Sequence, residues 1–97
     1  MAWSRVPFSR AETLAGAHHR IVNEAATSLR AAGNPQEAAV FGMTFPESGE
    51  VDLFFSPAAS SLLEDLLKLR SLTRCEKPSR EDVRLVVGPE AAWSLLD

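Results

Sequence analysis

Several features that often reveal function are missing from this sequence of 97 residues. It has no tyrosine and a single cysteine, Cys75, which excludes an intrachain disulfide and a multi-cysteine metal knuckle. No apolar run is long enough to span a membrane, and residues 1–8 lack the apolar core of a signal peptide. We therefore expect a cytoplasmic protein without a membrane partner.

A surplus of positive charge is also lacking. Ten Lys and Arg residues stand against thirteen Asp and Glu, which gives a net charge of −3 and a pI near 5.3. This balance disfavours nucleic acid as a partner, because its phosphates attract basic surfaces. The eight arginines against two lysines and the abundant alanine are typical of a GC-rich coding sequence, as in many bacteria, and indicate no mechanism.

Motifs that carry chemistry are absent as well. The sequence has no HExxH zinc motif, no Gly-rich phosphate loop, no GxSxG elbow and no dinucleotide-binding fingerprint. We therefore expect no cofactor and no catalytic residues, and we favour a protein that is not an enzyme.

What the sequence does contain is a pair of apolar segments, 38–45 and 51–55, around a turn at 46–50. This pattern predicts a hairpin in which Phe45 lies opposite Val51 and Phe41 opposite Phe55. One face would then be continuously apolar and covered by helices. The other face would be mixed, with Phe54 covering Gly42, and we expect another part of the chain or a second subunit to cover it. A shift of one residue in the turn would exchange these faces.

Two helices are predicted around this hairpin. Ser9 and Glu12 have the spacing of a capping box, and the helix that they begin can run to Ala32, where Gly33 stops it. Its apolar stripe comprises Leu14, His18, Ile21, Val22, Ala25 and Leu29. Ser56 and Pro57 mark the start of a second helix that should reach about Leu72. Its apolar arc, broader than one seam needs, comprises Leu62, Leu63, Leu66, Leu67 and Leu69.

The remaining segments complete a single domain over residues 1–97, since 45% hydrophobic content supports one core. We expect a polar connection over 73–82, a strand over 83–87 and a short terminal helix over 89–96. Residues 2–8 can form another strand, although Pro7 favours an edge position or no strand. The fold class is α+β, a two-layer sandwich with the ferredoxin-like order βαββαβ, or αββαβα without the first strand. If the strand at 83–87 is parallel to the second hairpin strand, the crossover between them should be right-handed.

His18 and His19 are the residues that most resemble a reactive site, because imidazole titrates near neutral pH and binds metals. Adjacent residues of a helix point about 100° apart, so the pair cannot readily hold one ion. A metal would need Cys75, Asp52 or a second subunit, and we expect none. His18 lies within the apolar stripe, where a neutral core histidine is the simplest interpretation and a ligand-binding residue the alternative.

Two further candidates lie near the end of the second helix. Arg74 and Lys77 would favour the thiolate of Cys75, but no general base is near it in sequence, so we interpret it as inert. Five basic residues between 70 and 84 are diluted by three acidic ones, which leaves only +2 and favours a solvated connection. They are Arg70, Arg74, Lys77, Arg80 and Arg84. If they converge, they could contact phosphate or an acidic partner.

These observations favour a small non-catalytic protein-interaction or regulatory module. We expect a homodimer formed through the mixed sheet face or the second helix, with interface candidates Val40, Gly42, Phe54, Leu63 and Leu67. The alternative is a small-molecule-binding domain or minor enzyme with a pocket near His18. A third possibility is a protein that lends an edge strand or an acidic surface to a larger macromolecule.

Overall fold

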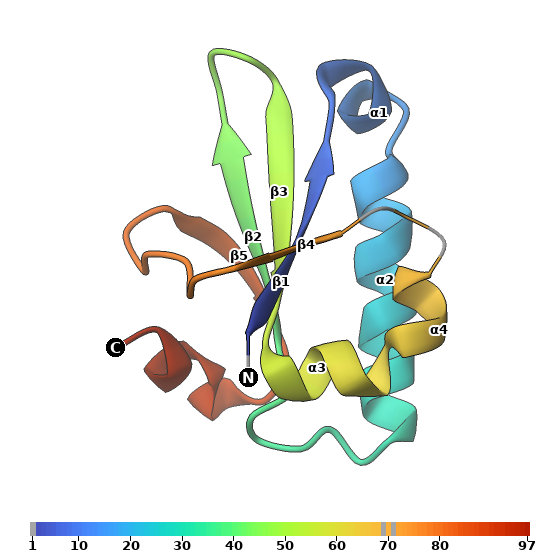
Figure 1. Ribbon diagram of the computed structural model, residues 1–97, viewed down its shortest axis with the longest axis vertical. Helices are drawn as coiled ribbons and strands as arrows, with labels where there is room; N and C mark the ends of the chain where they lie inside the picture. The colour runs from blue at the N-terminus through green and yellow to red at the C-terminus, as the bar shows by residue number, and fades with distance from the viewer. Residues whose placement is uncertain (1, 69, 71) are drawn as a thin grey trace.

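An antiparallel sheet organises the chain (Figure 1). The structure is a computed structural model that describes residues 2–68, 70 and 72–97. Within them the sheet has five strands in the order β4-β1-β3-β2-β5, and the fold is an α+β sandwich. In chain order the elements are β1 (Trp3–Phe8), α1 (Arg10–Leu14), α2 (Ala17–Ala31), β2 (Val40–Phe45), β3 (Glu50–Phe55), α3 (Pro57–Leu62), α4 (Glu64–Leu67), β4 (Thr73–Cys75), β5 (Val83–Val87) and the 3₁₀ helix η1 (Glu90–Leu96).

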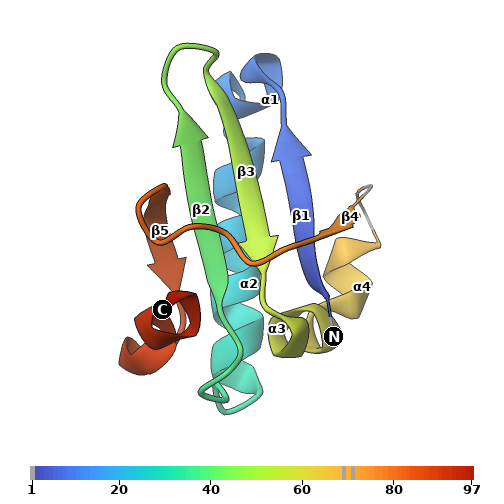
Figure 2. The same cartoon turned by 60° about the vertical axis from the view of Figure 1, so that its left-hand side comes forward.

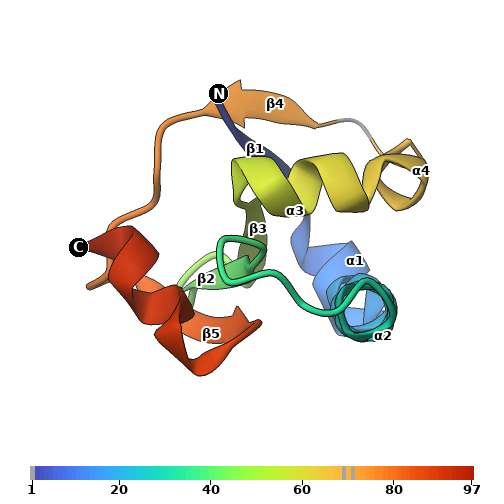
Figure 3. The same cartoon turned by 90° about the horizontal axis from the view of Figure 1, so that it is seen from below.

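The two faces of the sheet carry different cover (Figure 3). Helices α1 to α4 lie on one side, which we call the helix face. On the other side, the second face, lie η1 and the segment 76–82, which crosses the sheet from β4 to β5 (Figure 2). Each face has its own cluster of buried apolar residues. The second face is therefore covered by another part of the chain, which was one of the two expectations for the mixed face of the hairpin.

The N-terminal segment forms strand β1, and it lies inside the sheet between β3 and β4. Its side chains alternate, so that Ser4, Val6 and Phe8 are buried on the helix face. Pro7 is tolerated there because β4 pairs only with residues 3–5 of β1. Beyond the end of β4 no strand requires the missing N–H, and the Pro7 carbonyl accepts a hydrogen bond from Arg70 at 2.8 Å.

The prediction of a single helix from Ser9 to Ala32 is wrong, because the helix is interrupted at Gly16. The capping box forms as predicted, with Glu12 N donating to Ser9 Oγ at 3.3 Å and Ser9 N donating to Glu12 Oε1 at 3.1 Å. The left-handed conformation of Gly16, with φ 76°, then turns the chain before α2 begins. Leu14 is therefore 79% exposed, and the buried stripe consists of Val22, Ala25 and Leu29.

The second helix also differs from the prediction. Ser56 caps it and Pro57 is its first residue, as expected, and Ala59 N donates to Ser56 Oγ at 3.2 Å. It breaks at Leu63 into α3 and α4, which run in different directions, and α4 ends at Leu67. Leu63 and Leu67 are buried against the sheet while Leu62 is exposed. The expected helical residue Leu69 lies outside the described residues.

After α4 the chain forms a strand where a polar connection was expected. Strand β4 pairs with β1, and Leu72, directly before it, lies outside any helix. The predicted strand at 83–87 is β5, which pairs antiparallel with β2, so no parallel crossover ends there. The terminal helix is of the 3₁₀ type, with Leu96 buried and Trp93 partly exposed.

The hairpin register is one residue away from the prediction. Phe45 lies opposite Glu50 and Phe41 opposite Phe54, because Gly49 N donates to Phe45 O at 2.8 Å and closes the turn after residue 49. Gly49 supplies the positive φ, 73°, that this turn requires. The predicted faces of β2 are therefore exchanged. Val40 joins Leu53 and Phe55 on the helix face, while Phe41 packs with Phe54 on the second face.

Candidate functional site

His18 lies in the first turn of α2, directly after the Gly16 break. Its ring contacts the Phe8 ring edge-on at 6.2 Å and the His19 ring at 4.0 Å, both measured between centroids. Its Nδ1 is buried without a hydrogen-bond partner among the described residues. Burial, and secondarily the charge of His19, lower the pKa of His18, so the neutral form is favoured. His18 lines none of five cavities that the described residues form.

The five interface candidates are buried within the monomer. Val40, Leu63 and Leu67 belong to the core of the helix face, and Phe54 belongs to the core of the second face. Gly42 is buried opposite Leu53, and a Cβ built on it would lie 3.2 Å from Leu85 Cβ. An interface on the surface of this fold must therefore use other side chains.

Cys75 and Asp52 lie on the second face, apart from His18 on the helix face. Cys75 packs at the margin of the second-face cluster, and burial raises the pKa of its thiol, which opposes a reactive thiolate. Asp52 lies 4.0 Å from Arg5, but burial raises the pKa of its carboxyl. In the part of the chain that the structure describes, no three His, Cys, Asp or Glu side chains gather to hold a metal ion.

The basic residues between 70 and 84 do not converge. Arg70 binds Glu12 at 2.5 Å and stacks on the Phe8 ring, with its Cζ 4.1 Å from the ring centroid. The hydrogen bond from Arg70, with a second from Ser9 N, lowers the pKa of Glu12 to about 2. This contact joins the segment after α4 to the start of α1. Arg70 therefore has a structural role.

The other basic residues have separate roles. Lys77 donates to the Asp97 backbone carbonyl at 3.1 Å, and Arg80 pairs with the Asp97 carboxylate, so both hold the end of η1. Arg84 donates to the carbonyls of Glu81 and Val83, close to its own position. Only Arg74 among these five lacks an ion pair or hydrogen bond within the described residues while lining a cavity.

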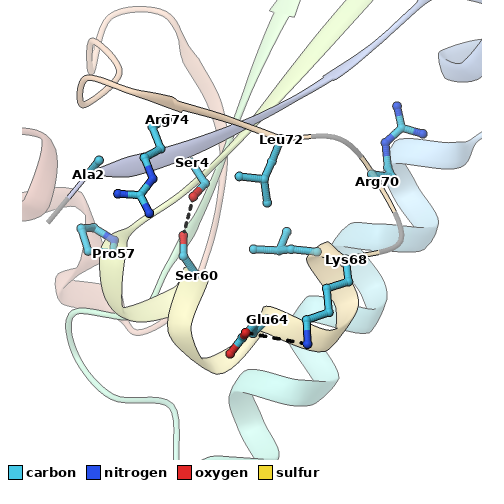
Figure 4. A pocket seen from close by; sticks show the side chains of 10 residues that line it. Ala2, Ser4, Pro57, Ser60, Glu64, Lys68, Arg70, Leu72 and Arg74 are labelled. Carbon is cyan, nitrogen blue, oxygen red and sulfur yellow. Dashed lines mark hydrogen bonds and ion pairs between the residues drawn. The ribbon is translucent and has the colours of Figure 1, made fainter.

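The cavity beside Arg74 has a volume of about 570 Å³ and lies between α3–α4 and the strands β1 and β4 (Figure 4). Its floor contains a serine pair, in which Ser60 Oγ donates to Ser4 Oγ at 3.0 Å. Leu67 and Leu72 form an apolar wall, and Lys68 lies at the rim, where it pairs with Glu64 at 3.8 Å. We call this space the serine cavity.

The sequence prediction missed this site, although β1 contains a signal for it. Buried positions alternate along β1, and Ser4 occupies one of them with 7% exposure. Ser56 is also buried among the described residues, but its burial is explained by its capping role, by the bond that Ala39 N donates to its Oγ and by the bond that its Oγ donates to Glu37 O. Ser4 has no such local role, and its partner Ser60 is 56 residues away in sequence.

The two edges of the sheet also differ in chemistry. The β4 edge has three residues, Thr73–Cys75, with Arg74 at its centre. The β5 edge has five residues, Val83–Val87, and Leu85 on it is 41% exposed. A groove of about 280 Å³ lies where the end of β5 meets α2. Its lining residues are Ala26, Leu29, Arg30, Asn34, Val87 and Gly88.

No protein-family model, curated protein or solved structure matches this chain. Among the described residues, no helix combines the length and the apolar character needed to cross a bilayer.

Proposed function

We propose that this protein is a small non-catalytic protein-interaction module that forms a homodimer by pairing the β5 edges of two copies. The observation that carries the proposal is the five-residue edge strand Val83–Val87, in which every side chain except that of Arg84 is apolar. The N–H and C=O groups on the outer side of an edge strand are a template for another strand. This proposal keeps the expected homodimer but moves its interface from the sheet face to the sheet edge.

The composition of β5 supports association. Natural edges are usually protected by short length, by charged side chains or by proline. Strand β5 has no proline and one charged residue, Arg84, whose guanidinium bonds the carbonyls of Glu81 and Val83. The bulge opposite Gly42 and Met43 interrupts only its first part. The apolar half of the strand is left available for a partner.

A second copy suits this edge because the strand is complementary to itself. If two β5 strands pair antiparallel with Leu85 opposite its own counterpart, Arg84 meets the partner's Val86. Val83 stays outside this pairing, because the bulge places it on the second face, whereas Val87 lies on the helix face. Like charges are not opposed in this register, and two exposed leucines cover each other. The groove where β5 meets α2 gives incoming side chains room beside Val87.

Light scattering after size exclusion tests the proposal over a range from low to high micromolar concentration. We expect the mass to rise from 10.6 kDa towards twice that value, because an edge pair is smaller than a typical stable interface. Leu85→Lys should abolish the rise, since a charged side chain on an edge opposes pairing. Leu62→Lys is the matched control, because Leu62 is 44% exposed on α3 and should leave association unchanged.

Three outcomes would contradict the proposal. The wild-type protein could remain a monomer throughout the range, Leu85→Lys could associate like the wild type, or Leu62→Lys could abolish association equally. Circular dichroism of each variant checks that the fold is intact.

We also propose a ferredoxin-like classification for the segment from β1 to β4. The elements β1, α2, β2, β3, α3 and β4 follow the βαββαβ order along the chain, and β1 lies between β3 and β4. The fourth strand of this unit is then Thr73–Cys75, and β5 and η1 are additions. The single cysteine still favours a cytoplasmic location.

A further inference from the structure

We propose that the serine cavity binds a small amphipathic carboxylate, whose anionic group contacts Arg74 and the serine pair and whose apolar chain packs on Leu67 and Leu72. The cavity of about 570 Å³ is within the size range of small-molecule sites. This site is distinct from the β5 edge, at the opposite side of the sheet.

Arg74 is placed to receive an anion by the register of the sheet. It lies directly opposite Ser4 in the β1–β4 pair, so both side chains point to the helix face. Figure 4 shows the Arg74 side chain turned toward Ser4 and Ser60. The other two cations at the cavity have carboxylate partners, since Lys68 pairs with Glu64 and Arg70 with Glu12. Arg74 has none within ion-pair distance among the described residues, so its charge is the one available to a ligand.

The serine pair supplies a neutral donor at the same place. Because Ser60 donates to Ser4, the hydroxyl hydrogen of Ser4 remains free to donate into the cavity. Ser4 is only 7% exposed and occupies a core position of β1, so its hydroxyl has a desolvation cost that a ligand oxygen would offset. The Arg74 guanidinium and the free hydroxyl hydrogen of Ser4 match the two oxygens of a single carboxylate, while Ser60 holds Ser4 in place.

The other lining residues favour a ligand with an apolar chain. Leu67, Leu72 and Pro57 line the cavity beside the polar group. A phosphate ion would leave these surfaces in contact with water and would gain little from them. A carboxylate with an alkyl chain would cover them, and burial of the chain would add to the affinity. Octanoate is a probe with both features.

An NMR titration of the labelled full-length protein with sodium octanoate tests the proposal. We expect saturable shifts of backbone amides at 2–4, 58–60 and 72–74. Octanol has the same chain without the charge, and inorganic phosphate has charge without the chain. Both should bind at least about tenfold more weakly, since a charge-assisted hydrogen bond and the burial of several methylenes each contribute more than 1.4 kcal/mol, the free energy of a tenfold change.

Variants separate the site from a general effect of charge. Arg74→Gln should weaken octanoate binding about tenfold and leave octanol binding unchanged. Ser60→Ala should weaken octanoate binding by a smaller factor. Arg20→Gln is the matched control, because it removes the same charge from the exposed face of α2. Octanoate that causes no saturable shifts would overturn the proposal, as would equal binding of octanol or phosphate, or equal losses in Arg74→Gln and Arg20→Gln. Light scattering of Arg74→Gln should match the wild type, so failure here and failure of the dimer proposal are distinguishable.

Discussion

Phe54 and Phe55 are neighbours in β3, but they are buried on opposite faces of the sheet. Phe55 is fully buried among the side chains of β1, β2, α2 and α3. Phe54 packs with Phe41 under the chain's C-terminal part. The helix face is covered by α-helices with regular internal hydrogen bonds. The second face is covered by the segment 76–82 and the seven-residue η1.

This difference indicates that the two buried faces of one sheet need not be equally rigid. The cover of the helix face is held by two capped helices and a large cluster of aliphatic and aromatic side chains. The cover of the second face is held by a smaller cluster and by the polar contacts of Lys77 and Arg80 with Asp97. A cover with fewer internal constraints can move more easily to close a cavity, and this reduces the cost of losing a buried side chain.

The largest expected effect separates the two phenylalanines. Phe55→Ala should lower the free energy of unfolding by about 3–5 kcal/mol, because the packed helices cannot collapse into the space left behind. Phe54→Ala should cost less than about 3 kcal/mol, because η1 and the 76–82 segment can shift toward the sheet. Urea denaturation of both variants measures the difference. Equal losses would show that the two covers are equally rigid, which would contradict this comparison.

An intermediate effect concerns acid stability on the helix face. The pKa of His18 is lowered in the folded protein from the ordinary value of 6.5, so the unfolded chain binds more protons below that pH. The contribution of neutral His18 to the free energy of unfolding is therefore complete above pH 6.5, and it should decrease as the pH drops below that value. His18→Gln removes this titration, so its stability should change less between pH 7.5 and 5.5.

Urea midpoints at these two pH values provide the measurement. The window lies above pH 4.5, where protonation of Glu12 begins to contribute, and the raised pKa of Asp52 affects both proteins alike. His19→Gln is the matched control, since His19 is exposed and lies next in the sequence. If His18→Gln and the wild type lose the same stability on acidification, burial of His18 does not control it.

The smallest expected effect concerns the polar ties of the second face. Arg80→Gln removes the ion pair with Asp97 and the contact of Arg80 with Trp93, where Cζ lies 5.4 Å from the ring centroid. Because both groups of the pair are about half exposed, we expect a loss of about 1 kcal/mol or less. Hydrogen exchange of the amides in η1 should rise more than that of β3. A loss of stability comparable to that of Phe54→Ala would show that the Arg80–Asp97 ion pair, and not apolar packing, holds η1 on the second face.

Local signals in the sequence predicted the starts of two helices well. Ser9 with Glu12 and Ser56 with Pro57 mark helix starts in the structure, because a cap needs only residues within one turn of each other. The helix breaks at Gly16 and Leu63 were not predicted, since apolar periodicity continues through both. Strand β4 was missed because its three residues are polar or partly exposed and depend on β1 for pairing.

The candidate sites show the same limit. His18 was found by its residue type, but it lines none of the five cavities described above. The serine cavity was missed because Ser4, Ser60 and Arg74 come from three distant parts of the chain. Only the alternation of buried positions along β1 indicated the site, because Ser4 occupies a position where an apolar residue is expected.

The sequence by itself determined that this protein is an α+β domain with capped helices and an apolar hairpin, because periodicity and capping act over a few residues. Only the tertiary structure decided which face each hairpin residue occupies, since a one-residue change in the turn reverses every side chain of a strand. It also decided that Arg74 faces Ser4 and that β5 is an edge, because strand order and register are set by contacts between distant segments.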